Sequence, residues 1–386
     1  MEFTILENHV DFVRNGANIK QLKTCNTGIP ITRIETLSNG VFNFDKLGYA
    51  NILDDKYQSF YLEDNDVLLS HINSAKFVGR SVIYKKSQLD KIIHGMNLLC
   101  IRFIKDKYLP DFFVWYTKSK QAKQYFVENT KHAVNQASIT STAIKQMPIP
   151  NVDISTQVSI TNDLNNINAA ISLAKERLLA LDELVKSRFI EMFGELDLSA
   201  QKSNWERLSE LGTIYTGTTP STSDESNWDG DILWITPAEM NEESFFISDT
   251  VRKITEKGAK SKSLTQMPIG TVLLSTRAPI GKVGIVAKPM TCNQGFKNLY
   301  CPDKLNSIYL YVLLKYNTQY LNSIGTGTTF KEISKTTCGN IRIPVPAMDK
   351  QNEFAEFVKL IDKSKFVCQF IQGTFYAKFA RFRPPP

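Results

Sequence analysis

The 386-residue sequence has little of what catalytic proteins usually need. It contains only four histidines, all within the first 132 residues, so the two ends of the chain cannot share a histidine-based acid, base or metal site. It has no G-x-G-x-x-G, G-x-S-x-G or H-E-x-x-H motif, and no Asn/Asp-Pro-Pro-Tyr/Phe loop of the kind found in DNA amino-methyltransferases. The stretch 212–219 has P-loop glycine spacing, but Thr218 stands where the phosphate-binding lysine belongs. These absences predict a chain that is not an enzyme, with no catalytic residue, metal or cofactor of its own.

Cysteine pairs, long apolar runs and blocks of one charge are also missing. The six cysteines have no C-x-x-C spacing, which predicts reduced, mostly buried thiols. No apolar run approaches the roughly 18 residues that a membrane span needs, and the N-terminal residues do not resemble a signal peptide, so we expect a cytoplasmic protein with no membrane partner. The net charge is +7, and residues 1–150 carry 19 Lys and Arg against 14 Asp and Glu. Any surface for a polyanion must therefore be assembled by the fold.

What the sequence does contain is an internal repeat. Similar segments recur in the same order: Val67 and Val272 lie in matching segments 205 residues apart, and Pro-x-Pro joints end at Pro150 and Pro346, 196 residues apart. The drift in offset is what short loop insertions produce in diverged copies. The repeat predicts two lobes of one topology.

Each copy contains the same series of expected elements. β-branched strands (67–70 and 272–275) precede a glycine turn and a second strand (81–85 and 283–286), and an aromatic helix (111–126 and 309–323) leads to the Pro-x-Pro joint. Because proline cannot continue a helix, each joint predicts a rigid extended exit from its lobe. A glutamine follows each joint, and a further helix is expected to begin there.

The helix after the first joint has a heptad seam. Eight apolar residues follow one another in steps of 4 and 3: Ile160, Leu164, Ile167, Ile171, Ala174, Leu178, Leu181 and Val185. This period predicts a coiled-coil helix from Thr156 to about Phe193, roughly 55–60 Å long, with Ser155 as N-cap and Gly194 as C-cap. A shorter helix, from Gln351 to about Gln372, offers an antiparallel partner. A single long helix packed on one globular core is the alternative.

Polar side chains gather at matching turns of both copies. Amides and guanidinium groups can pair with base edges, whereas hydroxyls and lysines suit phosphates. Any one cluster alone is as easily an ordinary turn, but the recurrence in both copies favours a DNA-reading role. The candidate DNA-binding residues are Arg33, Asn73, Asn135, Gln136, Thr218, Arg277, Asn293, Gln294, Thr328, Thr329 and Lys331.

These features together resemble a specificity subunit of a type I restriction–modification system. The segment LLALDELVKSRFIEMFGE (178–195) is similar to the central conserved helix of that family. The segment IPITRIETLSNGVFNFDKLGYA resembles the start of one of its target recognition domains, and GDILWITPAEM with STRAPIGKVGI and CNQGF resembles another. The resemblance implies an α+β chain in which two globular target recognition domains are separated by long helices forming an antiparallel coiled coil, with a pseudo-twofold internal repeat. The implied domains are 1–150 and 197–346 for recognition, 151–196 for the central spacer and 347–386 for an apparently short distal helical region.

The resemblance also implies the function and the partners. Each recognition domain would read one half of a bipartite site in double-stranded DNA, while the helix pair fixes the gap between the halves. Two modification subunits, which use S-adenosylmethionine to methylate adenine N6, would dock on the chain. Restriction subunits, which use ATP and Mg²⁺, would join that complex. A non-catalytic two-lobed coiled-coil scaffold that binds protein or glycan is the alternative, and a self-contained methyltransferase is a more distant one.

Overall fold

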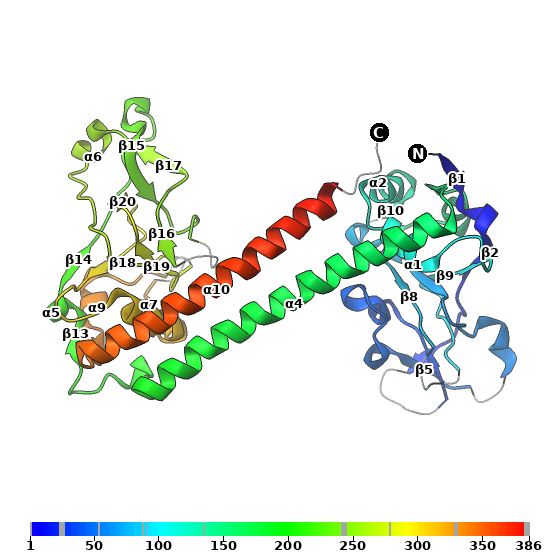
Figure 1. The fold of residues 1–386 in the computed structure, drawn as a ribbon, viewed down its shortest axis with the longest axis horizontal. Helices are drawn as coiled ribbons and strands as arrows, with labels where there is room; N and C mark the ends of the chain where they lie inside the picture. The colour runs from blue at the N-terminus through cyan, green and yellow to red at the C-terminus, as the bar shows by residue number, and fades with distance from the viewer. Residues whose placement is uncertain are drawn as a thin grey trace. The chain divides into compact units, whose positions relative to one another are not determined.

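The structure, a computed structural model, describes residues 2–22, 28–52, 55–86, 89, 91–133, 136–240, 245–277, 279–327 and 331–381. The chain divides into two compact units, Met1–Leu173 with Ile371–Pro386, and Ala174–Phe370. Each unit combines β-sheet with helices (Figure 1), which confirms the predicted α+β fold class. We call residues 2–150 the first lobe and residues 197–346 the second lobe.

The first lobe and the helix that follows it contain twelve strands and four α-helices among the described residues. The strands are β1 (Phe3–Ile5), β2 (Val10–Asn15), β3 (Gln21–Leu22), β4 (Ile29–Ile31), β5 (Gly48–Ala50), β6 (Val67–Ser70), β7 (Ile72–Asn73), β8 (Ser81–Ile83), β9 (Leu98–Phe103), β10 (Lys131–Ala133), β11 (Gln136–Ser138) and β12 (Pro148–Pro150). The helices are α1 (Pro110–Tyr116), α2 (Lys120–Asn129), α3 (Ser141–Lys145) and α4 (Ile154–Phe193).

The second lobe and the C-terminal helix contain the remaining described elements. The strands are β13 (Glu206–Arg207), β14 (Thr213–Tyr215), β15 (Trp228–Ile235), β16 (Phe246–Ile247), β17 (Arg252–Ile254), β18 (Val272–Leu274), β19 (Val283–Val286), β20 (Met290–Cys292), β21 (Asn298–Tyr300) and β22 (Arg342–Ile343). The helices are α5 (Leu208–Leu211), α6 (Glu256–Ser261), α7 (Ser307–Tyr316), α8 (Thr318–Ser323), α9 (Lys335–Asn340) and α10 (Met348–Arg381).

The main sheets of the two lobes repeat one strand order. The first lobe has β2-β9-β6-β8 and the second has β14-β21-β18-β19, and every neighbouring pair in both is antiparallel. The second lobe adds β16 in parallel at the β19 edge. The cross-strand partners of the two matching valines also agree: Ile83 and Ile101 for Val67, and Ile285 and Leu299 for Val272. The predicted internal repeat is confirmed strand by strand.

Both sheets bury both of their faces. Val67 and Leu69 point into a core shared with the helices α1 and α2, whereas Leu68 between them points into a separate core on the opposite face. In the second lobe Val272 and Leu274 face α7, while Leu273 faces the opposite core. Because side chains alternate along a strand, a continuous β-branched and leucine run is what a doubly covered strand requires.

The two Pro-x-Pro joints are fastened by equivalent glutamines. In the first unit Gln157 Oε1 accepts a hydrogen bond from the Leu109 backbone N–H (2.7 Å), which precedes α1, and its Nε2 donates to Val152 O (2.8 Å). In the second unit Gln351 Oε1 accepts from Asn306 N–H (2.9 Å), which precedes α7, and its Nε2 donates to Pro346 O (2.8 Å). Both glutamines are buried. Each glutamine therefore links the start of a long helix to the start of a helix in its lobe. This shared role explains why the Pro-x-Pro joint and its glutamine occur in both copies.

Each predicted aromatic helix is divided in two by the structure. The expected helix 111–126 ends as α1 at Tyr116, where the Thr117 hydroxyl donates to Val114 O (2.7 Å). Ser119 then caps a new helix, α2, by accepting from Ala122 N–H (3.2 Å). The expected helix 309–323 is likewise divided into α7 and α8. Hydroxyl side chains that bond to nearby backbone compete with helix continuation, which is the local reason for the break.

The central helix begins slightly earlier than predicted. Asp153, not Ser155, is its cap, because the Asp153 carboxylate accepts from the Thr156 backbone N–H (2.8 Å) and from the hydroxyls of Ser155 and Thr156. These bonds lower the pKa of Asp153 to about 2, the Ser155 hydroxyl contributing most. Gly194 follows the last residue with a φ of +80°, as predicted for the C-cap.

The predicted seam of α4 faces inward along the helix. Its eight seam residues are all buried or half-buried, with exposed residues between them. In the second unit α10 runs antiparallel beside the end of α4 (Figure 1): Arg188 pairs with Glu353 (2.8 Å), and Lys365 pairs with Asp182.

The distal helix is longer than predicted. It extends to Arg381 instead of ending near Gln372. No proline occurs between Pro346 and Pro384, and a single Gly373 costs a helix only about 1 kcal/mol, so nothing in this stretch stops the helix earlier.

The cysteines that the structure describes agree with the prediction of reduced, mostly buried thiols. The five cysteines that the structure describes are free and buried; Cys25 lies outside the described residues. Burial raises the pKa of Cys292 and Cys338 to about 12. Among the described helices, none has the length and apolar character needed to cross a bilayer.

Candidate nucleic-acid interface

In both lobes the residues that follow the central strand (β6 or β18) hydrogen-bond to the segment that precedes a short helix (α3 or α9). In the first lobe Ile139 N–H donates to His71 O (2.9 Å), and β7 pairs with β11, with Asn73 opposite Ala137. In the second lobe Ile333 N–H donates to Thr276 O (3.0 Å), and Arg277 forms an antiparallel bridge with Glu332. We call this arrangement the paired edge, made of 70–73 with 136–139 in the first lobe and 275–277 with 331–333 in the second.

The paired edge of the first lobe carries two of the predicted site residues. Asn73 is half-buried, donates through Nδ2 to Ser70 Oγ (3.2 Å) and accepts through Oδ1 from Ser74 N–H (2.8 Å). Gln136 is exposed on β11. Asn135 lies outside the described residues. Arg33 belongs to another loop, where it pairs with Glu35 (3.2 Å), and no described contact joins it to this edge.

The paired edge of the second lobe is built around charges. Arg277 Nε donates to Glu332 Oε2 (2.8 Å), and buried Lys297 reaches both Glu332 Oε1 (3.3 Å) and Thr276 Oγ1 (3.4 Å). Burial by itself would raise the pKa of Glu332, but the hydrogen bonds from Arg277 and Lys297 outweigh it and the pKa is lowered. The carboxylate therefore stays ionised at neutral pH, and as far as the described residues show, its bond to Nε leaves both terminal nitrogens of Arg277 for another acceptor.

Other candidates of the second lobe that the structure describes adjoin this edge. Thr276 N–H donates to Gly295 O (2.7 Å), and Asn293 Oδ1 accepts from Gly295 N–H (2.8 Å), so the loop containing Asn293 and Gln294 is fixed beside Arg277. Gln294 is exposed and accepts from the Thr219 hydroxyl (2.8 Å). Lys331 is exposed next to Glu332, whereas Thr328 and Thr329 lie outside the described residues.

Thr218 has a partly structural role. Its carbonyl accepts from the indole N–H of Trp234 (3.1 Å). The preceding Gly217 passes so close to the next loop that a Cβ there would lie 1.9 Å from Cys292 O. This close approach requires glycine at position 217, which explains the P-loop-like glycine spacing without a phosphate site. It also brings Thr218 to the same surface as Gln294.

Sequence reasoning missed Lys297 and Glu332. The available signal was a lysine within the apolar segment GFKNLYC (295–301), because a buried lysine requires a carboxylate partner. The identity of that partner, 35 positions later in the chain, follows only from the fold.

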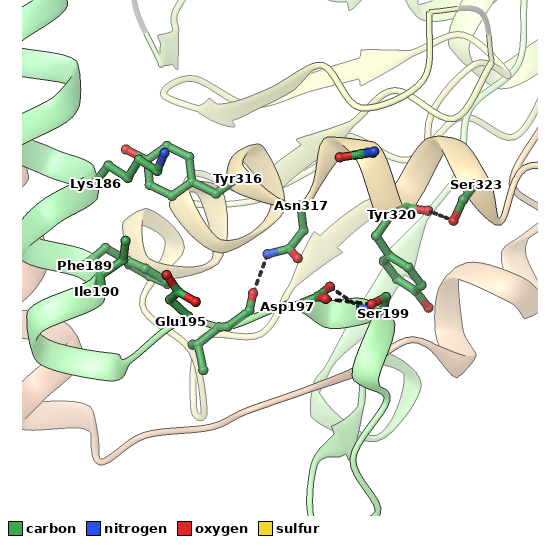
Figure 2. A pocket seen from close by; sticks show the side chains of 12 residues that line it. Lys186, Phe189, Ile190, Glu195, Asp197, Ser199, Tyr316, Asn317, Tyr320 and Ser323 are labelled. Carbon is green, nitrogen blue, oxygen red and sulfur yellow. Dashed lines mark hydrogen bonds between the residues drawn. The ribbon is translucent and has the colours of Figure 1, made fainter.

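A pocket of about 580 Å³ lies elsewhere in the second unit, where α4 ends (Figure 2). Asn317 fastens the chain there, since its Nδ2 donates to Leu196 O (2.9 Å) and its Oδ1 accepts from Leu198 N–H (2.8 Å). Glu195 and Asp197 line the pocket, and hydrogen bonds from Ser199 lower the pKa of Asp197. Two carboxylates disfavour a phosphate ligand, so this pocket is not part of the candidate interface.

Comparison with known proteins finds relatives in sequence and a neighbour in fold. Residues 202–366 match the family model of the type I restriction modification DNA specificity domain. The putative type I restriction enzyme MjaX specificity subunit of Methanocaldococcus jannaschii is 27% identical over 374 residues, which covers 92% of this chain and 85% of that protein. The MjaIX specificity subunit of the same organism is 40% identical over 184 residues, covering 46% of this chain and 43% of that protein.

A solved structure shares the fold. The S subunit of the type I restriction–modification system from M. genitalium superposes with a TM-score of 0.65 at 12% identity, covering 100% of this chain and 96% of that one.

Proposed function

We propose that this chain is a DNA specificity subunit of a type I restriction–modification system, a premise supported by the family-model match of residues 202–366 and by the similarity to the MjaX subunit. Each lobe then reads one half of a bipartite site in duplex DNA. The observation that carries the proposal is the paired edge. It occurs at the same place in two lobes of one strand order, yet it presents different side chains in each. A shared frame with different side chains is what two readers of different half-sites require.

The polar groups at the two edges suit base recognition in different ways. Asn73 and Gln136 in the first lobe have the amide geometry that pairs with adenine in the major groove. Arg277 in the second lobe has the guanidinium geometry that pairs with guanine O6 and N7. Each bidentate contact of this kind contributes about 1–3 kcal/mol of discrimination against a wrong base.

The same premise leads us to assign the chemistry to partner subunits. The chain acts with DNA and with other subunits of its restriction–modification system, and the finer proposal is a complex with two modification subunits and with restriction subunits. In that complex the modification subunits bind S-adenosylmethionine and methylate adenine N6, and the restriction subunits use ATP and Mg²⁺. This chain contributes no catalytic group and binds none of these cofactors.

We further propose that the length of the helical spacer determines the gap between the two half-sites. Deleting one heptad, Ala170–Glu176, shortens α4 by roughly 10 Å at 1.5 Å per residue. The complex is then expected to methylate a site with a shorter gap or to fail to assemble. Sequencing of methylated positions in host DNA checks this, and methylation of the original site at the original level would contradict it.

The test of the proposed function is reconstitution of this chain with its modification subunits. The complex should methylate a bipartite sequence, and its affinity for duplex DNA should fall steeply as salt rises, because phosphate contacts release counterions. A complex with weak, salt-independent DNA binding, or one whose methylation does not depend on this chain, would contradict the proposal and favour a protein- or glycan-binding scaffold.

A further inference from the structure

A cleft of about 590 Å³ in the first lobe has cations on both of its rims. Lys76 and Arg80 lie on one side, on the connection between β7 and β8, and Lys118 and Lys123 lie on the other, at the end of α1 and on α2. All four side chains are exposed. No aspartate or glutamate occurs among the described residues that line the cleft, and within the described chain none of the four cations forms an ion pair.

Aromatic rings hold three of these cations in place of carboxylates. The guanidinium carbon of Arg80 lies 4.4 Å, and the Lys76 ammonium 4.7 Å, from the centre of the Phe77 ring. The Lys118 ammonium lies 3.8 Å from the Trp115 ring. A cation–π contact positions a cation without neutralising its charge. The cleft therefore keeps its positive charge available for an anion.

The floor of the cleft is fixed by close packing. Gly79 lies against Phe126, so closely that a Cβ at Gly79 would be 2.2 Å from the Phe126 ring. Beneath it the buried hydroxyls of Ser81 and Thr117 share a hydrogen bond of 2.7 Å, which joins β8 to the end of α1. The two rims are thus held on a built scaffold, which lowers the entropic cost of gathering four cations around one ligand.

The cleft adjoins the paired edge of the first lobe. Lys76 follows Asn73 by three residues, and the short 3-10 turn Ala75–Phe77 that carries it contacts β11. A duplex whose bases meet Asn73 and Gln136 would bring its backbone to these cations.

The described residues at the matching place of the second lobe are arranged differently. Arg80 corresponds to Lys282, which points inward and donates to Pro237 O (3.0 Å) and Met240 O (2.8 Å). Gly281, which corresponds to Gly79, packs against Thr318 in place of a phenylalanine. Among the described residues, the cation of Arg80 at the cleft is therefore not repeated by Lys282 in the second lobe.

We propose that this cleft binds backbone phosphates of the DNA half-site read by the first lobe, an inference that rests on the proposed function. Lys76, Arg80, Lys118 and Lys123 contribute affinity and register without selecting a base.

The test compares two double variants in the complex with modification subunits. K76Q/K123Q removes two exposed cations of the cleft. K85Q/K145Q removes the same charge from first-lobe lysines that pair with Asp111 and Glu7 away from the cleft. The plot of log affinity for duplex DNA against log salt should become less steep by about 2 in K76Q/K123Q, since each phosphate contact contributes about 0.9. The methylated sequence should not change.

The outcomes separate this inference from the proposed function. If K76Q/K123Q and K85Q/K145Q give the same slope while the unmodified complex binds DNA with a steep salt dependence, the cleft assignment is wrong and the proposed function stands. If the unmodified complex itself shows no salt-dependent binding, the proposed function is wrong.

A footprint of lysine reactivity distinguishes DNA from a free anion. Lys76, Lys118 and Lys123 should be protected from reductive methylation by duplex DNA, and not by inorganic phosphate at the same phosphate concentration and ionic strength. Equal protection by inorganic phosphate, or no protection by DNA, would overturn the assignment to the DNA backbone.

Discussion

The two lobes share a frame and differ in where they place charge. Strand order, the glutamine of the joint and the paired edge are common to both. At the paired edge the second lobe carries Lys297 and Glu332, whereas the first lobe has Leu99 and Ser138 at the matching positions. The first lobe instead keeps unpaired cations in its cleft.

This difference shows which interactions preserve a fold and which are free to vary. The shared features are backbone hydrogen bonds and buried apolar contacts, whose loss costs stability in any lobe of this topology. The differing features are polar and charged side chains of the paired edge and of the cleft, which can change without disturbing the strand order. Two lobes of one origin can therefore recognise different DNA.

The largest expected effect falls on the feature that both lobes share. Gln157→Leu and Gln351→Leu should each destabilise the protein by roughly 2–5 kcal/mol, because each leaves a half-buried N–H and at least one half-buried carbonyl without its partner. Hydrogen exchange should locate the loss in the first unit for Gln157 and in the second for Gln351. Gln124→Leu, an exposed position, is the control. If only one of the two substitutions is destabilising, the joints are not equivalent.

Acid should destabilise the first lobe before the second. Burial lowers the pKa of His71 and of His94 to about 4, so the folded lobe keeps both neutral while the unfolded chain binds protons below about 6.5. Stability is therefore complete above pH 6.5 and is lost as the pH falls toward 4, by roughly 2 kcal/mol per histidine at pH 5. The second lobe contains no histidine.

Hydrogen exchange at pH 7 and pH 5, corrected for intrinsic rates, measures this asymmetry. Protection should fall in the first lobe and persist in the second. Equal loss of protection in both lobes would show that the buried histidines do not control the response to acid.

A smaller effect is expected from Glu332, which positions Arg277. Glu332→Gln leaves Arg277 without its charged partner and Lys297 buried without a counter-charge, and should weaken specific DNA binding about tenfold, or 1.4 kcal/mol. Glu332→Asp should restore part of the affinity. Glu256→Gln, which removes an exposed carboxylate paired with Lys260, is the matched control. If Glu332→Gln binds DNA as tightly as the control variant does, Glu332 does not position Arg277 for DNA binding.

The sequence predicted the internal repeat and the buried face of α4 better than it predicted the groups of polar side chains on the surface. Repeated segments predicted the two-lobed repeat, and the 4-3 spacing of apolar residues predicted which face of α4 is buried. Both predictions succeed because the spacing of apolar residues follows the pattern of burial along an element. The division of the aromatic helix at Thr117–Ser119 and the Asp153 cap depend on single side-chain hydrogen bonds, which the apolar pattern does not contain.

Charge clusters were harder to predict for a different reason. Lys297 pairs with Glu332, and Lys76 and Lys123 line the same cleft. The members of each pair are far apart in the sequence, and only the tertiary fold brings them together. Most of the second-lobe candidates were placed on one surface by the structure, whereas Arg33 was not joined to Asn73.

The most direct test of two independent readers is the methylated sequence produced by two single variants. Arg277→Ala should relax one base position in one half of the bipartite site and leave the other half intact. Asn73→Ala should do the reverse, relaxing only the opposite half. If sequencing of methylated DNA shows both halves altered by either variant, or the same half altered by both, the lobes do not read separate half-sites and the account is wrong.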